Sequence, residues 1–285
     1  MRYGVTMFVT DLSIGIVELA LAVEERGFDS LWLPEHTHIP TSRKTTHPSG
    51  GELPEKYKRS LDPLVALGAA ASATTTLRLG TGILLPAQRD PIVTAKAVAT
   101  LDHVSGGRVA LGIGFGWNED EIADHGVAFR DRRAVAREHV LAMQALWRED
   151  EAEFAGEHVT VSPSWSWPKP AQRGDDGRPA VPVLVGGAAG PKLLAQAVEY
   201  ADGWLPIGGA GLSSALPTLR AALDEAGRDP DGFEVVPFAA LPDHGKLDHY
   251  DRLGVTETVF DLPSAPADEV LPVLDRYAEI VAERR

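Results

Sequence analysis

Glycines, two histidines and a tryptophan lie at the ends of four short apolar runs of this sequence, where a ligand could reach them. These segments are Glu35-His36-Thr37-His38, Gly80-Thr81-Gly82-Ile83, Gly112-Ile113-Gly114-Phe115-Gly116-Trp117 and Gly186-Gly187-Ala188-Ala189-Gly190. Glycine allows a ligand to approach the backbone closely, and histidine can exchange a proton near neutral pH. We therefore expect the functional site to be built from these four segments.

The segment from Gly186 to Gly190 has the composition of a phosphate-binding turn. A helix is expected to start at Pro191, so unobstructed backbone N–H groups and the positive end of a helix dipole would face one point, with Lys192 in the first helical turn. The alternative is that the glycines only permit a tight connection. The spacing is not a dinucleotide fingerprint and no GxxxxGK[ST] motif occurs, so neither NAD nor a nucleoside triphosphate is indicated.

Two other glycine groups have both a ligand-binding and a packing interpretation. Gly82 interrupts a strand-like run, which indicates either a close approach to a ligand or a packing gap. Gly112, Gly114 and Gly116 alternate along one face of the next run, and they leave either a flat shelf for a planar ring or room for a neighbouring strand.

The HxH pair of His36 and His38 resembles the metal-binding pair of amidohydrolase barrels. Those barrels also need histidines at the ends of strands five and six, where this chain has Val185-Gly186-Gly187 and Ile207-Gly208-Gly209. We therefore predict no metal site, although Asp261 on strand eight would match. The absence of a GxSxG motif argues against a nucleophile-elbow esterase.

Three acidic residues, Glu119 to Glu121, follow Asn118 at an expected helix start. Acidic side chains favour the positive end of the helix dipole, and asparagine is a common N-cap. This structural interpretation is sufficient, so we expect no catalytic role for them.

The runs that carry these residues alternate with helical segments along the whole chain. The spacing of apolar residues predicts a helix over Leu12–Arg26, and Asp62-Pro63 and Asp90-Pro91 are expected to begin two further helices. Mostly continuous apolar strands are typical of a parallel sheet that is covered on both faces. The expected strands are Tyr3–Val9, Ser30–Pro34, Leu77–Leu85, Arg108–Gly114, Val181–Val185, Gly203–Ile207, Phe233–Phe238 and Thr256–Asp261. Eight such units predict an α/β fold of the (β/α)₈ TIM-barrel type, with its site at the carboxyl ends of the strands. A doubly wound open sheet is the alternative architecture.

The 285 residues fit one such barrel, so we expect a single domain over residues 1–285. The stretch Glu149–Ala180 is longer than an ordinary connection and contains Trp165, Trp167 and four prolines. We interpret residues 149–180 as an insertion that either covers part of the barrel mouth or forms a passive surface loop.

Charge and composition exclude several classes of protein. The chain has 41 acidic and 27 basic residues, a net charge of −14, which disfavours nucleic acid and anionic lipid as partners. It has no cysteine, which excludes disulfides, thiolate metal sites and a cysteine nucleophile. No apolar run approaches the ~20 residues that span a bilayer, and the first residues lack a signal-peptide pattern. We expect a cytoplasmic protein that does not bind membranes.

Taken in order, the motifs resemble those of the luciferase-like monooxygenases, in the branch that uses the deazaflavin coenzyme F420. The matching segments are Gly27–Trp32 with Glu35-His36, Leu61–Leu64, Leu77–Leu85 with Arg89-Asp90-Pro91, Leu101-Asp102 with Ser105–Arg108, Gly112–Trp117, Gly186-Gly187 and Ala201–Trp204. The resemblance covers nearly the whole chain and implies a (β/α)₈ barrel with an insertion before strand five.

The resemblance also assigns site residues. His36 matches a histidine near the reactive ring edge, so we predict it as catalytic, with Glu35 orienting it or bonding the ring. Thr81, Gly82 and Ile83 match the place of a non-prolyl cis peptide that supports the tricyclic ring. Gly112 and Gly114 would flank this ring. The turn of Gly186, Gly187, Ala188, Ala189 and Gly190 would hold the phosphate.

One position departs from a branch of this family. Where the sugar-phosphate dehydrogenases have a proton-donating glutamate, this chain has Trp117, so sugar-phosphate oxidation by that mechanism is not expected. Trp117 is instead expected to shape an apolar pocket or pack over the ring. Between His36 and Ser60, five basic residues against two acidic ones would suit an anionic coenzyme tail, or belong to an ordinary solvated loop.

The first hypothesis is an oxidoreductase that moves a hydride between coenzyme F420 and a small, largely apolar substrate. One alternative is an FMN-dependent monooxygenase that uses reduced flavin and oxygen. The other is a flavin- or deazaflavin-binding barrel without turnover. The resemblance further implies a homodimer.

Overall fold

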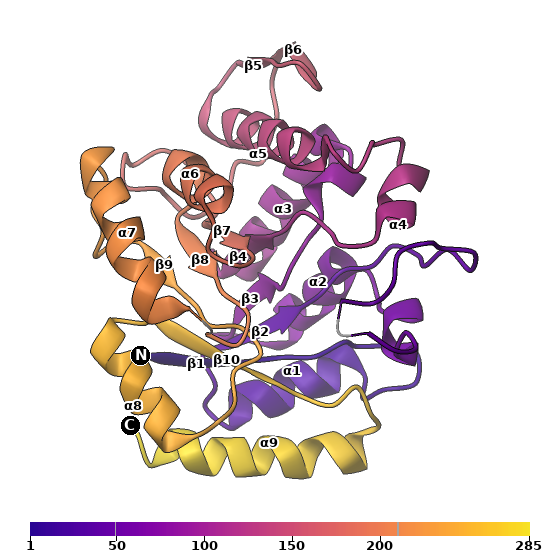
Figure 1. Cartoon of the computed structure of the whole chain (residues 1–285), viewed down its shortest axis with the longest axis vertical. Helices are drawn as coiled ribbons and strands as arrows, with labels where there is room; N and C mark the ends of the chain where they lie inside the picture. The colour runs from indigo at the N-terminus through magenta and orange to yellow at the C-terminus, as the bar shows by residue number, and fades with distance from the viewer. Residues whose placement is uncertain (49, 210) are drawn as a thin grey trace.

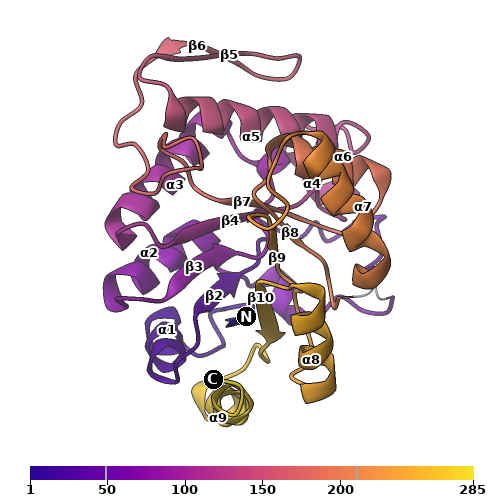
Figure 2. The same cartoon turned by 90° about the vertical axis from the view of Figure 1, so that its left-hand side faces the viewer.

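The computed structural model describes residues 1–48, 50–209 and 211–285, and its helices surround a barrel of parallel strands (Figures 1 and 2). The strands are β1 (Arg2–Thr6), β2 (Ser30–Leu33), β3 (Arg78–Thr81), β4 (Val109–Ile113), β7 (Val183–Gly186), β8 (Gly203–Leu205), β9 (Glu234–Val235) and β10 (Glu257–Asp261). They pair in the order β10-β1-β2-β3-β4-β7-β8-β9. Hydrogen bonds from Thr256 N to Val235 O and from Ala240 N to Val259 O connect the two edges. The predicted TIM-barrel fold is therefore confirmed.

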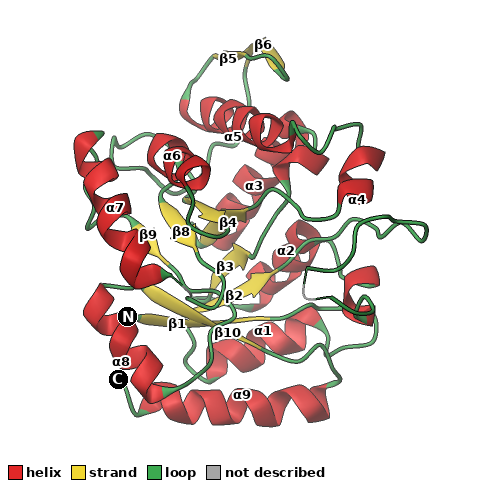
Figure 3. Ribbon diagram, viewed as in Figure 1, coloured by secondary structure: helices red, strands yellow, loops and turns green. Residues whose placement is uncertain are grey.

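The helices lie outside this barrel, as Figure 3 shows. They are α1 (Ile16–Glu25), α2 (Pro63–Ala73), α3 (Pro91–Ser105), α4 (Glu119–Asp124), α5 (Arg132–Arg148), α6 (Pro191–Tyr200), α7 (Leu212–Glu225), α8 (His244–Leu253) and α9 (Ala267–Ala282). The Asp-Pro pairs begin α2 and α3. The side chains of Asp62 and Asp90 accept hydrogen bonds from the backbone N–H of the third residue of each helix. Within the described residues, no helix is long and apolar enough to cross a membrane.

The first helix starts later than the hydrophobic spacing predicts. The pattern extends back to Leu12, but α1 begins at Ile16 and Leu12 is exposed. Thr10 N donates to Ser13 Oγ (2.9 Å), and Ser13 N donates to Thr10 O (3.4 Å). These local bonds offer the backbone an alternative to the helix, which delays its start.

An apolar layer fills the middle of the barrel. It consists of the buried residues Trp32, Ala110, Leu184, Leu205, Val236 and Val259. Ile83 and Phe238 pack on this layer and are partly exposed. Gly80 makes room for Trp32, because a Cβ at Gly80 would lie 2.1 Å from Trp32 Cε3. The barrel is thus a packed core, and a ligand can meet only its ends.

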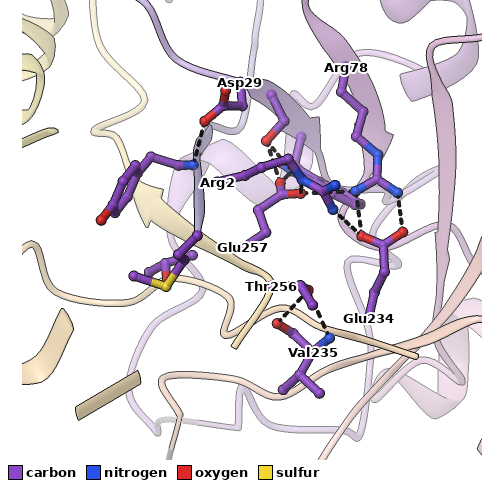
Figure 4. Close-up of polar contacts among 12 residues, drawn as sticks. Arg2, Asp29, Arg78, Glu234, Val235, Thr256 and Glu257 are labelled. Carbon is purple, nitrogen blue, oxygen red and sulfur yellow. Dashed lines mark hydrogen bonds and ion pairs between the residues drawn. The ribbon is translucent and has the colours of Figure 1, made fainter. Parts of the chain in front are cut away.

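Charged side chains fill the amino-terminal end of the barrel (Figure 4). Arg78 donates to Glu234 (2.6 Å) and to the fully buried Glu257 (2.9 Å), and Arg2 also bonds both carboxylates. Ser30 Oγ donates to Glu257 Oε1 (2.5 Å). Burial alone would raise the pKa of Glu234, but Arg78 lowers it below its usual range. The first residues of β1, β2, β3, β9 and β10 thus close this end, which serves stability in barrels.

The insertion contains a hairpin that the sequence analysis did not predict, made of β5 (Ala152–Ala155) and β6 (Thr160–Ser164). It packs on α5 and lies at the top of Figure 1, whereas the loops that follow β2 and β4 extend to the right. Residues 149–180 connect the end of α5 to the start of β7, and both lie at the amino-terminal end of the barrel. The insertion therefore lies on the outer surface of the barrel, beside α5.

A carboxylate on α5 fixes the hairpin. Glu138 accepts hydrogen bonds from the backbone N–H groups of Glu157 (3.0 Å), His158 (2.7 Å) and Val159 (3.1 Å). Burial alone would raise the pKa of Glu138, but these bonds lower it below its usual range. The ionised carboxylate therefore stabilises the hairpin fully above the unfolded-state pKa, and this contribution is lost as the pH falls through the lower folded-state pKa.

Glu138→Gln is expected to speed amide hydrogen exchange at residues 157–159 by about tenfold at neutral pH, because the bonds to a charged acceptor are worth about 1.5–3 kcal/mol. Mass spectrometry of exchanged peptides measures this. Glu153→Gln changes an exposed carboxylate of the same hairpin and is the matched control. Equal exchange in the two variants would contradict the role of Glu138.

Candidate functional site

The four predicted segments meet at one end of the barrel, which we call the mouth. They follow the carboxyl ends of β2, β3, β4 and β7, and these strands are neighbours in the sheet. Parallel strands place all their carboxyl ends on one side, so the loops that carry His36, Ile83, Trp117 and Gly187 lie together. The expectation that these four segments meet at one end of the barrel is therefore confirmed, and the assignment of this end as the functional site stays a prediction.

Ile83 and Phe238 form the floor of the mouth, and glycines make room for both. A Cβ at Gly82 would lie 2.2 Å from Phe238 Cζ, and a Cβ at Gly114 would lie 1.7 Å from Ile83 Cδ1. Gly186 also faces Ile83, at 2.9 Å. The Gly82–Ile83 peptide is cis, as the resemblance implied. Whether this peptide supports a bound ring stays a prediction.

Strand packing accounts for Gly112. A Cβ there would lie 2.1 Å from the backbone oxygen of Thr81 and 2.7 Å from Leu205 Cδ1. Thr81 is buried, and its Oγ1 donates to Gly112 O (2.7 Å). The packing interpretation of Gly112 is thus sufficient, and contacts of Gly112, Gly114 and Thr81 with a cofactor stay predictions.

The imidazole of His36 lies at the mouth and is held by Glu121. His36 Nδ1 is 2.8 Å from Glu121 Oε2, and both side chains are almost completely buried. Glu121 Oε1 accepts a hydrogen bond from Thr37 N (3.3 Å). No described residue forms a hydrogen bond with His36 Nε2, so this nitrogen has its capacity left for a ligand.

No described hydrogen bond joins Glu35 to His36, so the expected orienting contact is not formed, and a bond from Glu35 to a cofactor ring stays a prediction. The buried Glu35 carboxylate accepts hydrogen bonds from Leu85 N (2.6 Å) and Arg89 Nε (2.6 Å). Burial raises the pKa of Glu35, and Arg89 opposes this rise. Glu35 thus ties the loop after β2 to the loop after β3, and Arg89, which also pairs with Asp62, ties the loop after β3 to the start of α2. Glu121 takes the orienting contact instead.

Aromatic rings form one wall of the mouth around His36. The ring centroid of His36 lies 5.1 Å from Tyr57, 5.8 Å from Trp117 and 6.5 Å from Phe8. His47 packs on Tyr57 and Trp117, at 4.9 Å and 5.5 Å. The predicted role of Trp117 in shaping an apolar pocket fits this position.

The sequence analysis expects the acidic residues after Asn118 only to complement a helix dipole. In the structure, two of them also bind the loop after β2. Asp120 accepts hydrogen bonds from the backbone of Lys44 (2.8 Å) and Thr45 (3.1 Å). These bonds lower the pKa of Asp120. Together with Glu121, Asp120 ties α4 to the loop after β2. The sequence carried no signal for these contacts, because the partners are more than 70 residues apart.

Asn118 is a second site residue that the sequence analysis missed. It occupies the N-cap position of α4, but its side chain does not cap the helix. The amide is almost completely buried, and neither its oxygen nor its nitrogen has a partner among the described residues. A buried amide without partners is costly, so this group is a candidate contact for a ligand.

The turn after β7 presents donors at the mouth. Gly187 is fixed within the protein, since its N–H donates to Leu205 O (3.2 Å) and its carbonyl accepts from Trp204 Nε1 (2.8 Å). No described residue accepts from the N–H groups of Ala188, Ala189 and Gly190. These donors precede α6, which has no side-chain cap. The arrangement is one that suits a phosphate.

The two histidines of the HxH pair have different partners. His38 Nε2 lies 2.9 Å from Asp124 at the end of α4, and both side chains are exposed. Across residues 1–48, 50–209 and 211–285 there is no group of three or more side chains arranged to hold a metal. Of the basic residues after β2, Lys58 and Arg59 pair with Glu55.

Gly112→Ala is expected to lower the free energy of unfolding by about 1–3 kcal/mol without any cofactor, because the added methyl meets a backbone oxygen that cannot rotate away. Urea unfolding measures this. Gly245→Ala, in α8, meets only ordinary contacts and is the control, with a gain of up to about 1 kcal/mol. Unchanged stability of Gly112→Ala would contradict the packing role.

The structure thus defines a (β/α)₈ barrel with a candidate site at the strand ends, and comparisons with known proteins agree on the fold. A model of the family described as luciferase-like monooxygenase matches residues 14–241. An uncharacterized protein of Mycobacterium tuberculosis is 42% identical over 99% of both chains. An F420-dependent glucose-6-phosphate dehydrogenase of Kineococcus radiotolerans is 33% identical over 75% of this chain and 59% of that protein.

A solved structure is similar over its whole length. It is an F420-dependent secondary alcohol dehydrogenase in complex with an F420-acetone adduct, with a TM-score of 0.76, 21% identity and complete coverage of both chains. At this identity the likeness shows the fold alone. The chain belongs to the luciferase-like monooxygenase family.

Proposed function

We propose that this protein is an oxidoreductase that transfers a hydride between coenzyme F420 and a small, largely apolar organic substrate. The observation that carries the proposal is the buried His36, with Nδ1 held by Glu121 and Nε2 left for a ligand. A relative named for its F420 dependence, 33% identical over 75% of this chain, supports the choice of coenzyme.

The residues at the mouth fit a planar group with a phosphorylated side chain. Ile83 and Phe238 offer an apolar floor for a ring, and the N–H groups of Ala188 to Gly190 offer donors for a phosphate. The orphaned amide of Asn118 offers one donor and one acceptor to a ring edge. When bound, the deazaflavin would supply the hydride acceptor or donor.

The residues of the chain would transfer the proton and exclude water from the site. His36 would hold or release a proton at Nε2, which is the role of a general acid or base. Phe8, Tyr57 and Trp117 would exclude water from this nitrogen and favour an apolar substrate. Trp117 has no acidic group, so the wall does not suit a mechanism that needs a proton-donating glutamate there.

Two alternatives use the same mouth. FMN also has a planar ring and a phosphate, so an FMN-dependent monooxygenase is the second candidate. Arg43 and Lys44 form no ion pair with any described residue, and they would suit the longer anionic tail of F420. A barrel that binds a flavin or deazaflavin without turnover would have no use for the held imidazole of His36.

Equilibrium titrations with F420 and with FMN, followed by tryptophan fluorescence, test the proposal. We expect F420 to bind at least about tenfold more tightly than FMN, because only F420 adds a charged tail. Tight binding of FMN alone would favour the monooxygenase, and binding of neither would contradict the whole assignment.

His36→Ala is the matched variant in the same titrations. It should bind F420 within about threefold of the wild type, while hydride transfer with a panel of small apolar alcohols, ketones and enones falls by about 100-fold or more. Unchanged turnover in this variant would remove His36 from the mechanism.

We also propose that the chain forms a homodimer through α2 and α3. These neighbouring helices expose Val65 (76%), Val93 (67%) and Val104 (59%). Exposed apolar side chains on two adjacent helices are the kind of surface that a second copy of the chain could cover. Light scattering should give twice the 30.5 kDa chain mass, and Val65→Lys with Val93→Lys should shift it toward one chain. Val17→Lys on α1 is the control; a monomeric wild type at micromolar concentration would contradict the dimer.

A further inference from the structure

We infer that Glu121 is a positioning residue that fixes the tautomer and the orientation of the His36 imidazole. The inference rests on the proposed function only in that it assigns His36 a part in the reaction. The first evidence is a distance in the protein without any ligand, since His36 Nδ1 lies 2.8 Å from Glu121 Oε2.

The chemistry of an ionised carboxylate determines which imidazole nitrogen carries the hydrogen. A carboxylate can only accept hydrogen bonds, so the nitrogen that contacts it must be the donor. In a neutral imidazole this leaves a lone pair on the other nitrogen, Nε2. Glu121 therefore assigns Nε2 the role of the acceptor, which is the form needed to take a proton from a ligand.

The carboxylate is itself held in place from a second direction. Thr37 N donates to Glu121 Oε1 (3.3 Å), so the two oxygens bond to consecutive residues of the loop after β2. The Glu121 side chain is 1% exposed and that of His36 is 7% exposed. A buried carboxylate without donors would be costly, so both bonds stabilise the side chain in this position.

The aromatic wall restricts the same imidazole on its other sides. Trp117 meets the ring edge-on at 5.8 Å, and Tyr57 packs at 5.1 Å with a tilt of 55°. Neither neighbour contributes a hydrogen bond to the imidazole. The rings therefore limit where the imidazole lies, and Glu121 alone among the described residues decides which nitrogen bears the hydrogen.

The same helix carries a natural control for this contact. Asp124, one turn after Glu121, pairs with His38 through Nε2 (2.9 Å), but the two side chains are 59% and 41% exposed. This pair has the same chemical types, and no described hydrogen bond joins it to His36, since the other ring nitrogen of His38 contacts Thr37 Oγ1 (3.0 Å). Its loss should leave the state of His36 unchanged.

Nitrogen-15 NMR of the histidine side chains tests the inference in the protein without cofactor. In the wild type at a pH where His36 is neutral, Nδ1 should have the chemical shift of a protonated nitrogen and Nε2 that of an unprotonated one. In Glu121→Gln the amide can either donate to or accept from Nδ1, so the two shifts should move toward each other. Asp124→Asn should leave both shifts in place.

Kinetics separate positioning from a merely structural role. Glu121→Gln should lower kcat for hydride transfer by about 10- to 100-fold, with KM and the Kd for F420 within about threefold. In a His36→Ala background the same change should cost nothing further, since its effect runs through the imidazole. Asp124→Asn should keep kcat within about twofold.

The outcomes distinguish this inference from the proposed function. A wild-type His36 with its hydrogen on Nε2 overturns the inference, whatever the fate of the variants, and so does an undiminished kcat in Glu121→Gln. An additive loss in the double variant also overturns it. Failure to bind F420 overturns the proposed function instead, and the NMR result then still decides the role of Glu121.

Discussion

The interior of an eight-stranded parallel barrel must be filled by side chains, and the way this chain fills it determines the rest of the structure. Arg78 and Glu257 close one end, Trp32 occupies the middle, and Ile83 and Phe238 lie at the other end. Glycines stand opposite these bulky groups because there is no space for a Cβ. Gly82, Gly114 and Gly186 are thus required by packing, and the apolar floor is the surface that this packing creates.

Two buried glutamates near the mouth show how the same residue type takes different tasks. Glu35 has donors from Leu85 and Arg89, and it therefore holds the loop after β3. Glu121 has donors from His36 and Thr37, and it therefore acts on the imidazole. In both cases the donors that stabilise the buried carboxylate also determine which part of the site it holds.

Sequence reasoning succeeded where local patterns are strong. The alternation of apolar runs and helices predicted all eight barrel strands, and Asp62-Pro63 and Asp90-Pro91 predicted two helix starts. It did not predict the β5–β6 hairpin, because apolar and polar residues alternate only weakly along these strands. The hairpin depends instead on a tertiary contact with Glu138. Sequence reasoning also failed for Glu121, because helix-dipole chemistry already explained an acidic residue there and its partner lies 85 positions away.

The tie between α4 and the loop after β2 has a consequence for how such a site can diversify. Asp120 holds Lys44 and Thr45, while Glu121 holds His36 and Thr37, so adjacent residues of one short helix anchor both arms of that loop. A change in the length of either element would break contacts in the other. The loop after β2 and the segment that carries α4 must therefore be exchanged together when this barrel is recombined with a relative to change which substrate it binds.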